Sequence, residues 1–351
     1  MPQRNPGRST TSRKKQHVDL TLTKNVNFKA KTTGLEDLEF VHNALPELNL
    51  SDIDTSTRFL DRTLKLPFMV SCMTGGYAEA LAINRQIAEV CQDAGIAMGV
   101  GSQRQAMEDT RYHRTFSVVR EAASSIPVVG NLGAAEVARL ENADGAKRLV
   151  DLIRADAFTV HLNPLQELLQ PEGNTDFRGV LRGIALLVKG LPVPVIVKEI
   201  GAGISADVAR RLLDTGVRYI DIAGSGGTSW AGVESFRAER QSFARQFWDW
   251  GIPTAQAIRD VAPLKAQYPR FTLIASGGIT SGLDAAKSIA LGADLVASAR
   301  PMLKALHQHK KRGLRELIAS WGRELRTVMF LTGSATIGDL HRAPLTRSST
   351  S

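Results

Sequence analysis

Eight short apolar segments recur along this chain from residue 67 onward, and no other feature constrains the fold as strongly. They cover residues 67–73, 95–101, 126–132, 156–162, 193–200, 218–224, 272–278 and 293–300. Most are too short to be helices and are rich in Val and Ile, which is typical of parallel strands buried on both faces. Segments with helical periodicity lie between them, including residues 80–94, 205–216 and 281–292. Ser281 predicts the start of the last of these helices, and Gly292 predicts its end.

This alternation predicts an α/β protein of the TIM (β/α)8-barrel class. A doubly wound open sheet is the alternative, because alternation alone does not show that a sheet closes. Eight strands at a spacing of about thirty residues favour the barrel. The long connection over residues 229–271 is the exception, and we interpret it as an insertion between strands 6 and 7 that can shape or cover a site. The first 60 residues form an N-terminal extension outside the barrel.

The formal net charge of +9 comes from one end of the chain. Residues 1–31 hold eight Lys or Arg against the single acid Asp19, which leaves 36 of the 44 basic and 34 of the 35 acidic residues for the rest. A basic arm of this kind is usually a solvated tail. Two other functions stay open, a nucleic-acid-binding arm and a flap over an anionic ligand.

Cys72 and Cys91 are the two cysteines, and no CxxC or CxxC…HxxxH spacing is present, which argues against a zinc site. The amino terminus has no apolar segment typical of a secretion signal. No apolar run approaches the roughly 20 residues that a membrane span requires. The sequence therefore predicts a soluble, cytoplasmic protein that does not enter a membrane.

Polar residues and glycines gather where the predicted strands end. A TIM barrel builds its active site from the loops at these carboxyl ends. Glycine-rich loops after strands 7 and 8 are typical of a phosphate site, and Lys198 at the end of an apolar strand is costly to bury without a partner. The segments concerned are residues 73–76, 101–104, 130–133, 198–199, 224–228, 276–279 and 297–300.

The fourth strand ends in the most unusual group, which contains His161, Asn163, Gln166 and Glu167. A lone histidine is more often a structural hydrogen-bonding residue than a catalyst, but here four polar side chains converge and a functional role is favoured. With a single carboxylate nearby, a metal at this place is predicted to be Mg²⁺ shared with substrate phosphates. The chain has no GxSxG elbow, no GxxxxGK[ST] loop, and no GxGxxG after its first strand.

Several motifs in one order identify a family. Residues 13–17 read RKKQH and match an RKxxH opening, and residues 161–167 read HLNPLQE and match HLNxxQE. Between and after them stand TGL (33–35), FVH (40–42), MTGG (73–76), GSQ (101–103), PEG (171–173), VKE (197–199), GGT (226–228), SGG (276–278) and the segment 324–340. The chain from Arg13 to Leu345 resembles the type 2 isopentenyl-diphosphate isomerases.

This resemblance implies a TIM barrel that binds FMN and Mg²⁺ and interconverts isopentenyl diphosphate and dimethylallyl diphosphate. The reaction has no net redox change but needs reduced FMN, with NADPH as the reductant. The resemblance also implies a homo-oligomer, a tetramer or an octamer, that binds no nucleic acid. The domain organisation expected is a disordered tail at 1–12, one domain at 13–345 whose arm at 13–60 binds substrate, and a tail at 346–351.

The motifs also imply a role for individual residues. FMN is expected to contact Cys72, Met73, Thr74, Ser102, Asn131, Lys198 and Thr228, with its phosphate near Gly277, Gly278, Ala299 and Arg300. The substrate diphosphate is expected at Arg13, Lys14, His17 and His161, and Mg²⁺ at Glu167. Gln166, His161 and Asn163 form the expected catalytic group, and Gln166 also contacts substrate.

Simple chemistry refines these roles. A neutral amide is a poor acid and base, so Gln166 is better suited to relay or position a proton beside a flavin that acts as the main acid and base. Two residues depart from the family pattern. Cys72 stands where Ala is common, and Arg300 replaces a smaller residue, which is expected to strengthen anion binding.

The nearest alternative is another FMN-dependent TIM-barrel oxidoreductase. A 2-hydroxy-acid oxidase needs a His–Arg pair near the last strands, and an IMP-dehydrogenase-like enzyme needs a catalytic Cys loop; neither is evident. A nucleic-acid-binding protein that uses residues 1–31 is the alternative of another class. That hypothesis leaves the glycine-rich strand ends unexplained.

Overall fold

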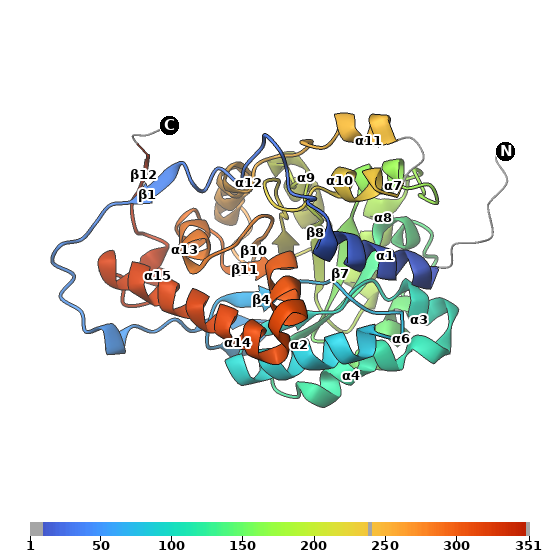
Figure 1. The fold of residues 1–351 in the computed structure, drawn as a ribbon, viewed down its shortest axis with the longest axis horizontal. Helices are drawn as coiled ribbons and strands as arrows, with labels where there is room; N and C mark the ends of the chain where they lie inside the picture. The colour runs from blue at the N-terminus through green and yellow to red at the C-terminus, as the bar shows by residue number, and fades with distance from the viewer. Residues whose placement is uncertain (1–9, 238–240, 349–351) are drawn as a thin grey trace.

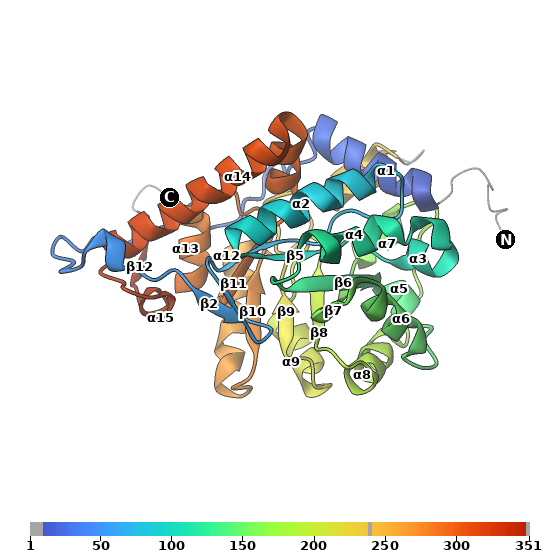
Figure 2. The same cartoon turned by 90° about the horizontal axis from the view of Figure 1, so that it is seen from below.

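The computed structural model describes residues 10–237 and 241–348, and its centre is a closed barrel of eight parallel strands (Figures 1 and 2). Seven barrel strands lie inside their predicted segments and β6 extends one residue past its own; the closed barrel confirms the TIM-barrel class and excludes an open sheet. In barrel order from the first in sequence, the strands are β4 (Phe68–Val70), β5 (Ala97–Gly99), β6 (Val128–Gly133), β7 (Ala157–Leu162), β8 (Val195–Glu199), β9 (Tyr219–Asp221), β10 (Thr272–Ala275) and β11 (Leu295–Ser298).

Helices surround the barrel. The longer ones are α2 (Ala80–Ala94), α4 (Arg114–Ala122), α6 (Asp144–Ile153), α8 (Val180–Gly190), α9 (Ala206–Asp214), α12 (Thr254–Val261), α13 (Gly282–Ala290) and α14 (Arg300–Leu331). The helices predicted over 80–94, 205–216 and 281–292 are confirmed as α2, α9 and α13. Ser281 caps α13 by accepting a hydrogen bond from Asp284 N, and Gly292 follows the helix with φ +114°. Among the described residues, no helix is long and apolar enough to cross a membrane.

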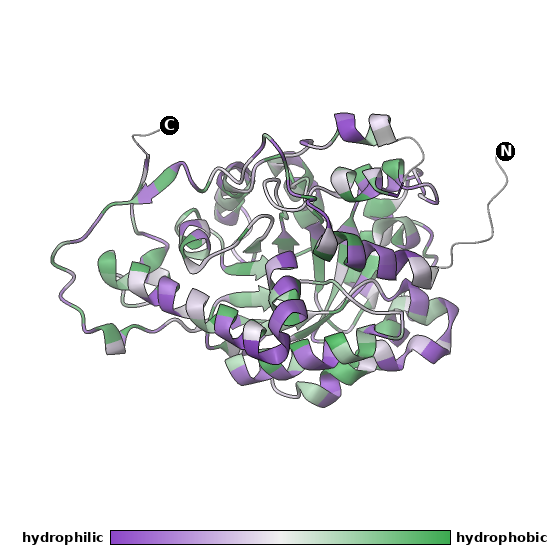
Figure 3. Cartoon of the chain, viewed as in Figure 1, coloured by the Kyte–Doolittle hydropathy of each residue, from purple (hydrophilic) through white to green (hydrophobic). Residues whose placement is uncertain are grey.

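Two apolar layers hold this arrangement. One lies between the sheet and the helices, and the other fills the barrel itself with side chains such as Met69, Val129 and Ile196. Figure 3 shows hydrophobic residues along the strands and hydrophilic residues on the outer helices. Because the barrel interior is packed, a ligand has to bind at a mouth of the barrel and not along its axis.

A hairpin closes the mouth at the amino ends of the strands. It consists of β2 (Thr57–Phe59) and β3 (Arg62–Leu64), and Phe59 meets Tyr219 edge to face at the start of β9. Arg62 in the hairpin donates to Asp156 Oδ1, and Arg120 from α4 donates to Asp156 Oδ2 at 2.5 Å. Asp156 thus ties the hairpin and a helix to the start of β7.

Apart from the helix at the amino terminus, the remaining helices are short, and several of them follow the carboxyl ends of barrel strands or lie in the insertion. They are α3 (Arg104–Glu108), α5 (Ala134–Val137), α7 (Pro164–Leu169), α10 (Trp230–Ser235), α11 (Gln241–Gln246) and α15 (Ile337–Leu340), with 3-10 turns at Leu50–Asp52, Thr110–Tyr112 and Ala262–Ala266. The predicted insertion contains α10, α11 and α12. The insertion contributes one wall of the cavity described below.

The two ends of the chain differ from the sequence prediction. Helix α1 (Thr10–Thr23) already includes residues 10–12, which we expected in a disordered tail; residues 1–9 lie outside the described residues. Strand β12 (Leu345–Arg347) pairs antiparallel with β1 (Leu38–Phe40), so the expected tail at 346–351 begins inside a strand, and residues 349–351 are again outside the described part. Both elements depend on distant partners, which local sequence patterns do not reveal.

Substituting Asp156→Asn should lower the free energy of unfolding by about 2 kcal/mol, because two guanidinium groups lose their carboxylate. Burial alone would raise the pKa of Asp156, but the Val128 N–H and the two arginines hold it below its usual value. The stabilisation is therefore present above the unfolded pKa of the carboxyl and is lost as pH falls through the folded pKa.

Urea denaturation at several pH values measures this effect. The wild-type protein and the variant should converge in acid and separate near neutral pH. Glu316→Gln is the control, because Glu316 pairs with Arg312 at 3.8 Å on the exposed surface of α14 and should leave the midpoint unchanged. Equal midpoints for wild type and Asp156→Asn at pH 7 would contradict the assignment.

Candidate active site

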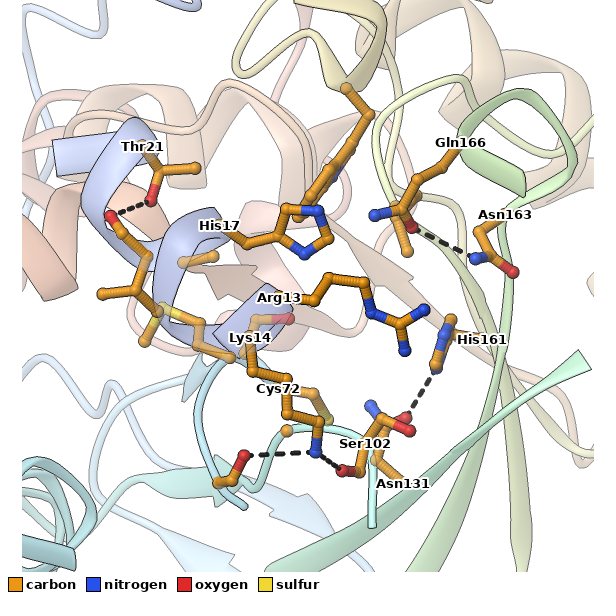
Figure 4. A pocket seen from close by; sticks show the side chains of 18 of the residues that line it. Arg13, Lys14, His17, Thr21, Cys72, Ser102, Asn131, His161, Asn163 and Gln166 are labelled. Atoms are coloured by element: carbon orange, nitrogen blue, oxygen red, sulfur yellow. Dashed lines mark hydrogen bonds between the residues drawn. The ribbon is translucent and has the colours of Figure 1, made fainter. Parts of the chain in front are cut away.

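A cavity of about 250 Å³ opens at the carboxyl ends of the strands (Figure 4). Its wall combines helix α1 with the loops that follow six strands, the first turn of α10 and the start of α14. Predicted site residues that line it are Arg13, Lys14, His17, Cys72, Met73, Ser102, Asn131, His161, Asn163, Gln166, Glu167, Lys198, Thr228, Ala299 and Arg300. The structure therefore brings together residues separated by as many as 287 positions in the chain.

Three predicted residues do not line this cavity. Thr74 Oγ1 is turned away and hydrogen-bonds Asn84 Oδ1, while the Thr74 carbonyl accepts from Gly101 N at 2.7 Å. Gly277 and Gly278 have φ of +97° and +73°, and a Cβ at Gly277 would collide with the Gly224 carbonyl. Glycine is required there because the loops after β9 and β10 pack backbone against backbone.

Helix α1 supplies one side of the cavity. In Figure 4, Arg13, Lys14 and His17 project from it towards the barrel. Lys14 Nζ donates to the carbonyls of Gly75, at 3.1 Å, and Ser102. Burial and the adjacent Arg13 lower the pKa of Lys14 to about 7. An ammonium group held this far below its usual pKa lies in an environment that favours an added anion.

His161 is the second-last residue of β7, and its side chain enters the cavity from the side opposite α1. Burial, together with the charges of Lys198, Lys14 and Arg13, lowers its pKa to about 3. The ring is therefore neutral near pH 7. Its Nδ1 lies 2.7 Å from Asn131 Oδ1, which can only accept, so Nδ1 carries the proton and Nε2 is left as an acceptor. An anion that neutralises the surrounding cations would favour protonation of this ring.

An amide and carboxylate group follows β7. Asn163 precedes α7, whose first residue is Pro164, and the helix then presents Gln166 and Glu167 in its first turn. Asn163 Nδ2 donates to Gln166 Oε1 at 3.1 Å and to Glu167 Oε1 at 3.0 Å. The N–H of Asn174 donates to Glu167 Oε2 at 2.6 Å. The orientation of the Gln166 amide is therefore determined by its neighbours.

Glu234 is a site residue that the sequence analysis missed. It lies on α10 in the insertion, behind the cavity wall, with its side chain fully buried. Gln166 Nε2 lies 3.2 Å and His17 Nε2 lies 2.8 Å from the same atom, Glu234 Oε1. Burial alone would raise the pKa of Glu234, but the His17 hydrogen bond and the charges of His17 and Arg237 hold it below its usual value. The group is a carboxylate at neutral pH.

Arg237 supports this carboxylate from behind. Its guanidinium is fully buried and donates to Glu234 Oε2 at 2.6 Å, to Glu172 Oε1 at 2.5 Å and to Gln16 Oε1 at 3.0 Å. One side chain thus joins α10, α1 and the loop after α7. The sequence signal was a Glu–Arg pair three residues apart, at the end of a short helix and just beyond it, which looks like an exposed surface pair when burial is unknown.

Lys198 brings a buried ammonium group to the floor of the cavity at the end of β8. Its Nζ donates to the Glu199 carbonyl at 2.6 Å and lies 3.5 Å from Asp221 Oδ2. The neighbouring Glu199 turns away, and its Oε2 accepts from the N–H groups of residues 200–202. Burial raises the pKa of Glu199 to about 7. Lys198, and not Glu199, is therefore the side chain of this pair that lines the cavity.

Cys72 lies close to Lys198 at the end of β4. Burial raises the pKa of its thiol, and the Lys198 charge offsets only part of that effect. The group is therefore a thiol and not a thiolate at neutral pH. This makes Cys72 a wall residue, without the nucleophilic character that a lowered pKa confers.

The donor chemistry of the wall fits a flavin and a hard cation. Lys198 lines the cavity, and so does Gly101, whose backbone packs against the loop after β4, since a Cβ there would lie 2.7 Å from the Met73 carbonyl. Asn163 Oδ1 is buried without a hydrogen-bond partner in the wall that also holds the Glu167 carboxylate. Oxygen donors of these two types suit Mg²⁺. The described part of the chain contains no group of three His, Cys, Asp or Glu side chains that could hold a metal alone.

Comparison with known proteins identifies the family. A sequence model of the FMN-dependent dehydrogenases matches residues 8–150 and 170–347. A protein of Pelodictyon phaeoclathratiforme named isopentenyl-diphosphate delta-isomerase is 50% identical, over 96% of this chain and 98% of its own. The chain belongs to the isopentenyl-diphosphate delta-isomerase family. Relatives with the same name from Chlorobium limicola and Methanothermobacter thermautotrophicus are 48% and 44% identical, over 96% and 95% of this chain and 96% and 93% of theirs.

Solved structures support the fold of this isomerase family member. A lactate oxidase of Pediococcus acidilactici aligns with a TM-score of 0.68 at 16% identity, over 95% of this chain and 87% of that one. A mandelate oxidase in complex with (S)-2-phenylpropionate aligns with a TM-score of 0.67 at 18% identity, over 95% and 94%. At this level of identity the likeness concerns the fold alone.

Substituting Arg237→Met should lower the free energy of unfolding by about 3 kcal/mol at pH 7, because it leaves buried Glu234 without its guanidinium partner. Glu234→Gln in that background should recover part of the loss by removing the unpaired charge. Denaturant titration of the wild type, both single variants and the double variant gives the coupling energy. Strict additivity of the two single effects would show that the two groups do not interact.

Proposed function

We propose that this enzyme interconverts isopentenyl diphosphate and dimethylallyl diphosphate by a 1,3-allylic proton shift, with reduced FMN and Mg²⁺. The observation that carries the proposal is that one cavity combines a cationic arm with an amide relay. Arg13 and Lys14 face it from α1, and Gln166, hydrogen-bonded to Glu234, faces it from α7. The first group suits a diphosphate, and the second suits a proton transfer near an uncharged hydrocarbon.

The diphosphate is held by the arm and by β7. Arg13, Lys14 and His17 provide donors on one side, and His161 provides a ring on the other. Because several cations depress the pKa of His161, an anion placed among them would raise it again and make His161 a donor to phosphate oxygen. Binding of the substrate would thus charge the residue that holds it.

Mg²⁺ would be held by the Glu167 carboxylate, with the buried Asn163 Oδ1 beside it. Two protein oxygens do not complete the shell of this ion, so phosphate oxygens and water supply the rest. The metal therefore belongs to the substrate complex.

FMN would lie against the backbone at Cys72 and Met73, with Ser102, Asn131, Lys198 and Thr228 around it. The start of α14 at Ala299 offers helix N–H groups to its phosphate. When bound and reduced, FMN supplies an electron-rich ring that stabilises positive charge on the hydrocarbon. Lys198 would lie at the polar edge of that ring and stabilise its negative charge.

The proton path on the protein side runs through Gln166. Its amide is a weak acid and base, but its Nε2 contacts the Glu234 carboxylate at 3.2 Å. When the hydrocarbon gives a proton to the Gln166 amide, the Nε2–H can pass a proton to the Glu234 carboxylate, and the same path returns it. The buried network around Arg237 keeps this carboxylate in place and excludes water from it.

The decisive test is anaerobic incubation of the protein with isopentenyl diphosphate, FMN, NADPH and Mg²⁺, followed by analysis for dimethylallyl diphosphate. We expect equilibration of the two diphosphates, and loss of the activity when Mg²⁺ is chelated. Flavin absorbance of the purified protein is measured in parallel. An enzyme that binds FMN and leaves isopentenyl diphosphate unchanged while it oxidises lactate or mandelate would instead support the alternative, another FMN-dependent oxidoreductase.

Gln166→Ala should lower kcat by about a hundredfold, because it removes the relay to Glu234. The measurement is kcat at saturating isopentenyl diphosphate.

Glu167→Gln should raise the Mg²⁺ concentration needed for half-maximal activity by at least about tenfold and leave FMN affinity unchanged. Glu141→Gln, an exposed position, is the control for loss of a carboxylate. Full activity in the double variant Gln166→Ala, Glu167→Ala would sink the proposal.

The pH dependence should reveal Lys14. Because its pKa is lowered to about 7, the free enzyme loses this positive charge above neutral pH, and kcat/KM for the diphosphate should fall there. Lys14→Arg should abolish that decline, because guanidinium stays charged throughout the range. The measurement is kcat/KM from pH 6 to 9 for both proteins. An identical alkaline limb in the variant would assign the titration to another group.

NADPH as the reductant and assembly into a homotetramer or homo-octamer stay predictions from the family resemblance. A cytoplasmic location, and the expectation that neither nucleic acid nor a membrane is a partner, stay predictions from the sequence. Reduction of the bound flavin by NADPH under argon, and the molar mass in solution by light scattering, test the first two.

A further inference from the structure

Arg300 makes contacts that the sequence analysis did not anticipate. It begins α14 directly after β11, at the end of the barrel where an FMN phosphate is expected. Its Nε donates to the Thr21 carbonyl at 2.7 Å and its Nη2 donates to the Lys24 carbonyl at 3.0 Å. Its Nη1 donates to Asn27 Oδ1. All three acceptors lie at the end of α1 or just beyond it.

Two of these acceptors, the Thr21 and Lys24 carbonyls, are groups that the end of a helix leaves unsatisfied. The last carbonyls of any α-helix have no partner within the helix, and a cation near them is favourable. The last turn of α1 contains no basic residue of its own. Arg300 therefore supplies, from 276 or more positions away, the donor and the charge that this helix end lacks.

Helix α1 depends on such polar contacts for its position. None of its residues from 11 to 23 is fully buried, so apolar packing contributes little to its docking. Lys14 is bonded to two loop carbonyls near its start, and His17 contacts Glu234 near its middle. Arg300 is the contact at its end. Gln16 also accepts from Arg237 and Lys15 pairs with Glu79, so polar contacts restrain α1 along its length and Arg300 restrains its C-terminal end.

We propose that Arg300 is a positioning residue that fastens the C-terminal end of α1 to the rim of the barrel, and thereby holds Arg13, Lys14 and His17 over the cavity. The sequence analysis did not predict this role, and the flavin-phosphate contact expected for Arg300 stays a prediction beside it. It rests on the proposed function only in describing α1 as the substrate-binding arm. The contacts themselves belong to the protein without substrate.

Hydrogen–deuterium exchange of the FMN-saturated protein, without substrate, tests the proposal. In Arg300→Ala, amides of residues 17–27 should exchange at least about tenfold faster than in the wild type, because three hydrogen bonds to a charged donor are lost. Peptides from α2 (Ala80–Ala94) should be unchanged and serve as the internal reference. Exchange of residues 17–27 at the wild-type rate would overturn the proposal. A tenfold lower FMN affinity in the same variant would then assign Arg300 to flavin binding instead.

Matched variants show whether α1 is held by the hydrogen bonds of Arg300 or only by a positive charge at this end of α14. Lys304→Ala removes a positive charge one turn further along α14 and should leave the exchange of α1 unchanged. Arg300→Lys keeps the charge but loses the fork of donors, so its exchange rate should lie between those of wild type and Arg300→Ala. If Arg300→Ala does not fold, Asn27→Ala removes an acceptor from the other side and should loosen the same segment; wild-type exchange in that variant would also overturn the proposal.

Steady-state kinetics give a second readout. Loosening the arm should raise KM for isopentenyl diphosphate by about tenfold and change kcat by less than about threefold, since binding is weakened and the relay at Gln166 is untouched. The exchange experiment contains no substrate, so it succeeds or fails independently of the proposed reaction. A protein without isomerase activity would still show whether Arg300 holds α1.

Discussion

Closure of the parallel sheet is the constraint on which the rest of this structure depends. Because all eight strands point the same way around a barrel, every strand end opens into one mouth. Ser102, Asn131, His161 and Lys198 come from four different strands and meet there without any local sequence relation. The packed interior and the β2–β3 hairpin close the other end, so chemistry is confined to the carboxyl mouth.

Buried charge then organises the mouth. A carboxylate as deeply buried as Glu234 requires partners, and those it has come from α1, α7 and α10. The same contacts hold the arm and the insertion against the barrel. On the other side, burial, together with the charges of Lys198, Lys14 and Arg13, lowers the pKa of His161 and leaves its ring neutral. Structure and electrostatics therefore prepare one cavity for an anion with an uncharged, reactive tail.

Much of this could be predicted from the sequence. Apolar runs located all eight barrel strands, since strands buried on both faces consist of apolar residues whatever surrounds them. Ser281 marked a helix start, because its cap is a contact within four residues. The pairing of β1 with β12 was missed, because its partners are some three hundred residues apart. Glu234 and Arg237 were missed for a related reason: a short helix with two opposite charges looks exposed until its burial is known.

The sequence by itself determined the barrel, the order of its polar strand ends and the family, because periodicity and motif spacing are local properties of the chain. Only the tertiary structure decided which of those residues meet. It turned Thr74 away towards Asn84, packed Gly277 against Gly224, and directed Arg300 to the end of α1. Side-chain direction and burial depend on contacts between distant segments, and a linear pattern does not specify those contacts.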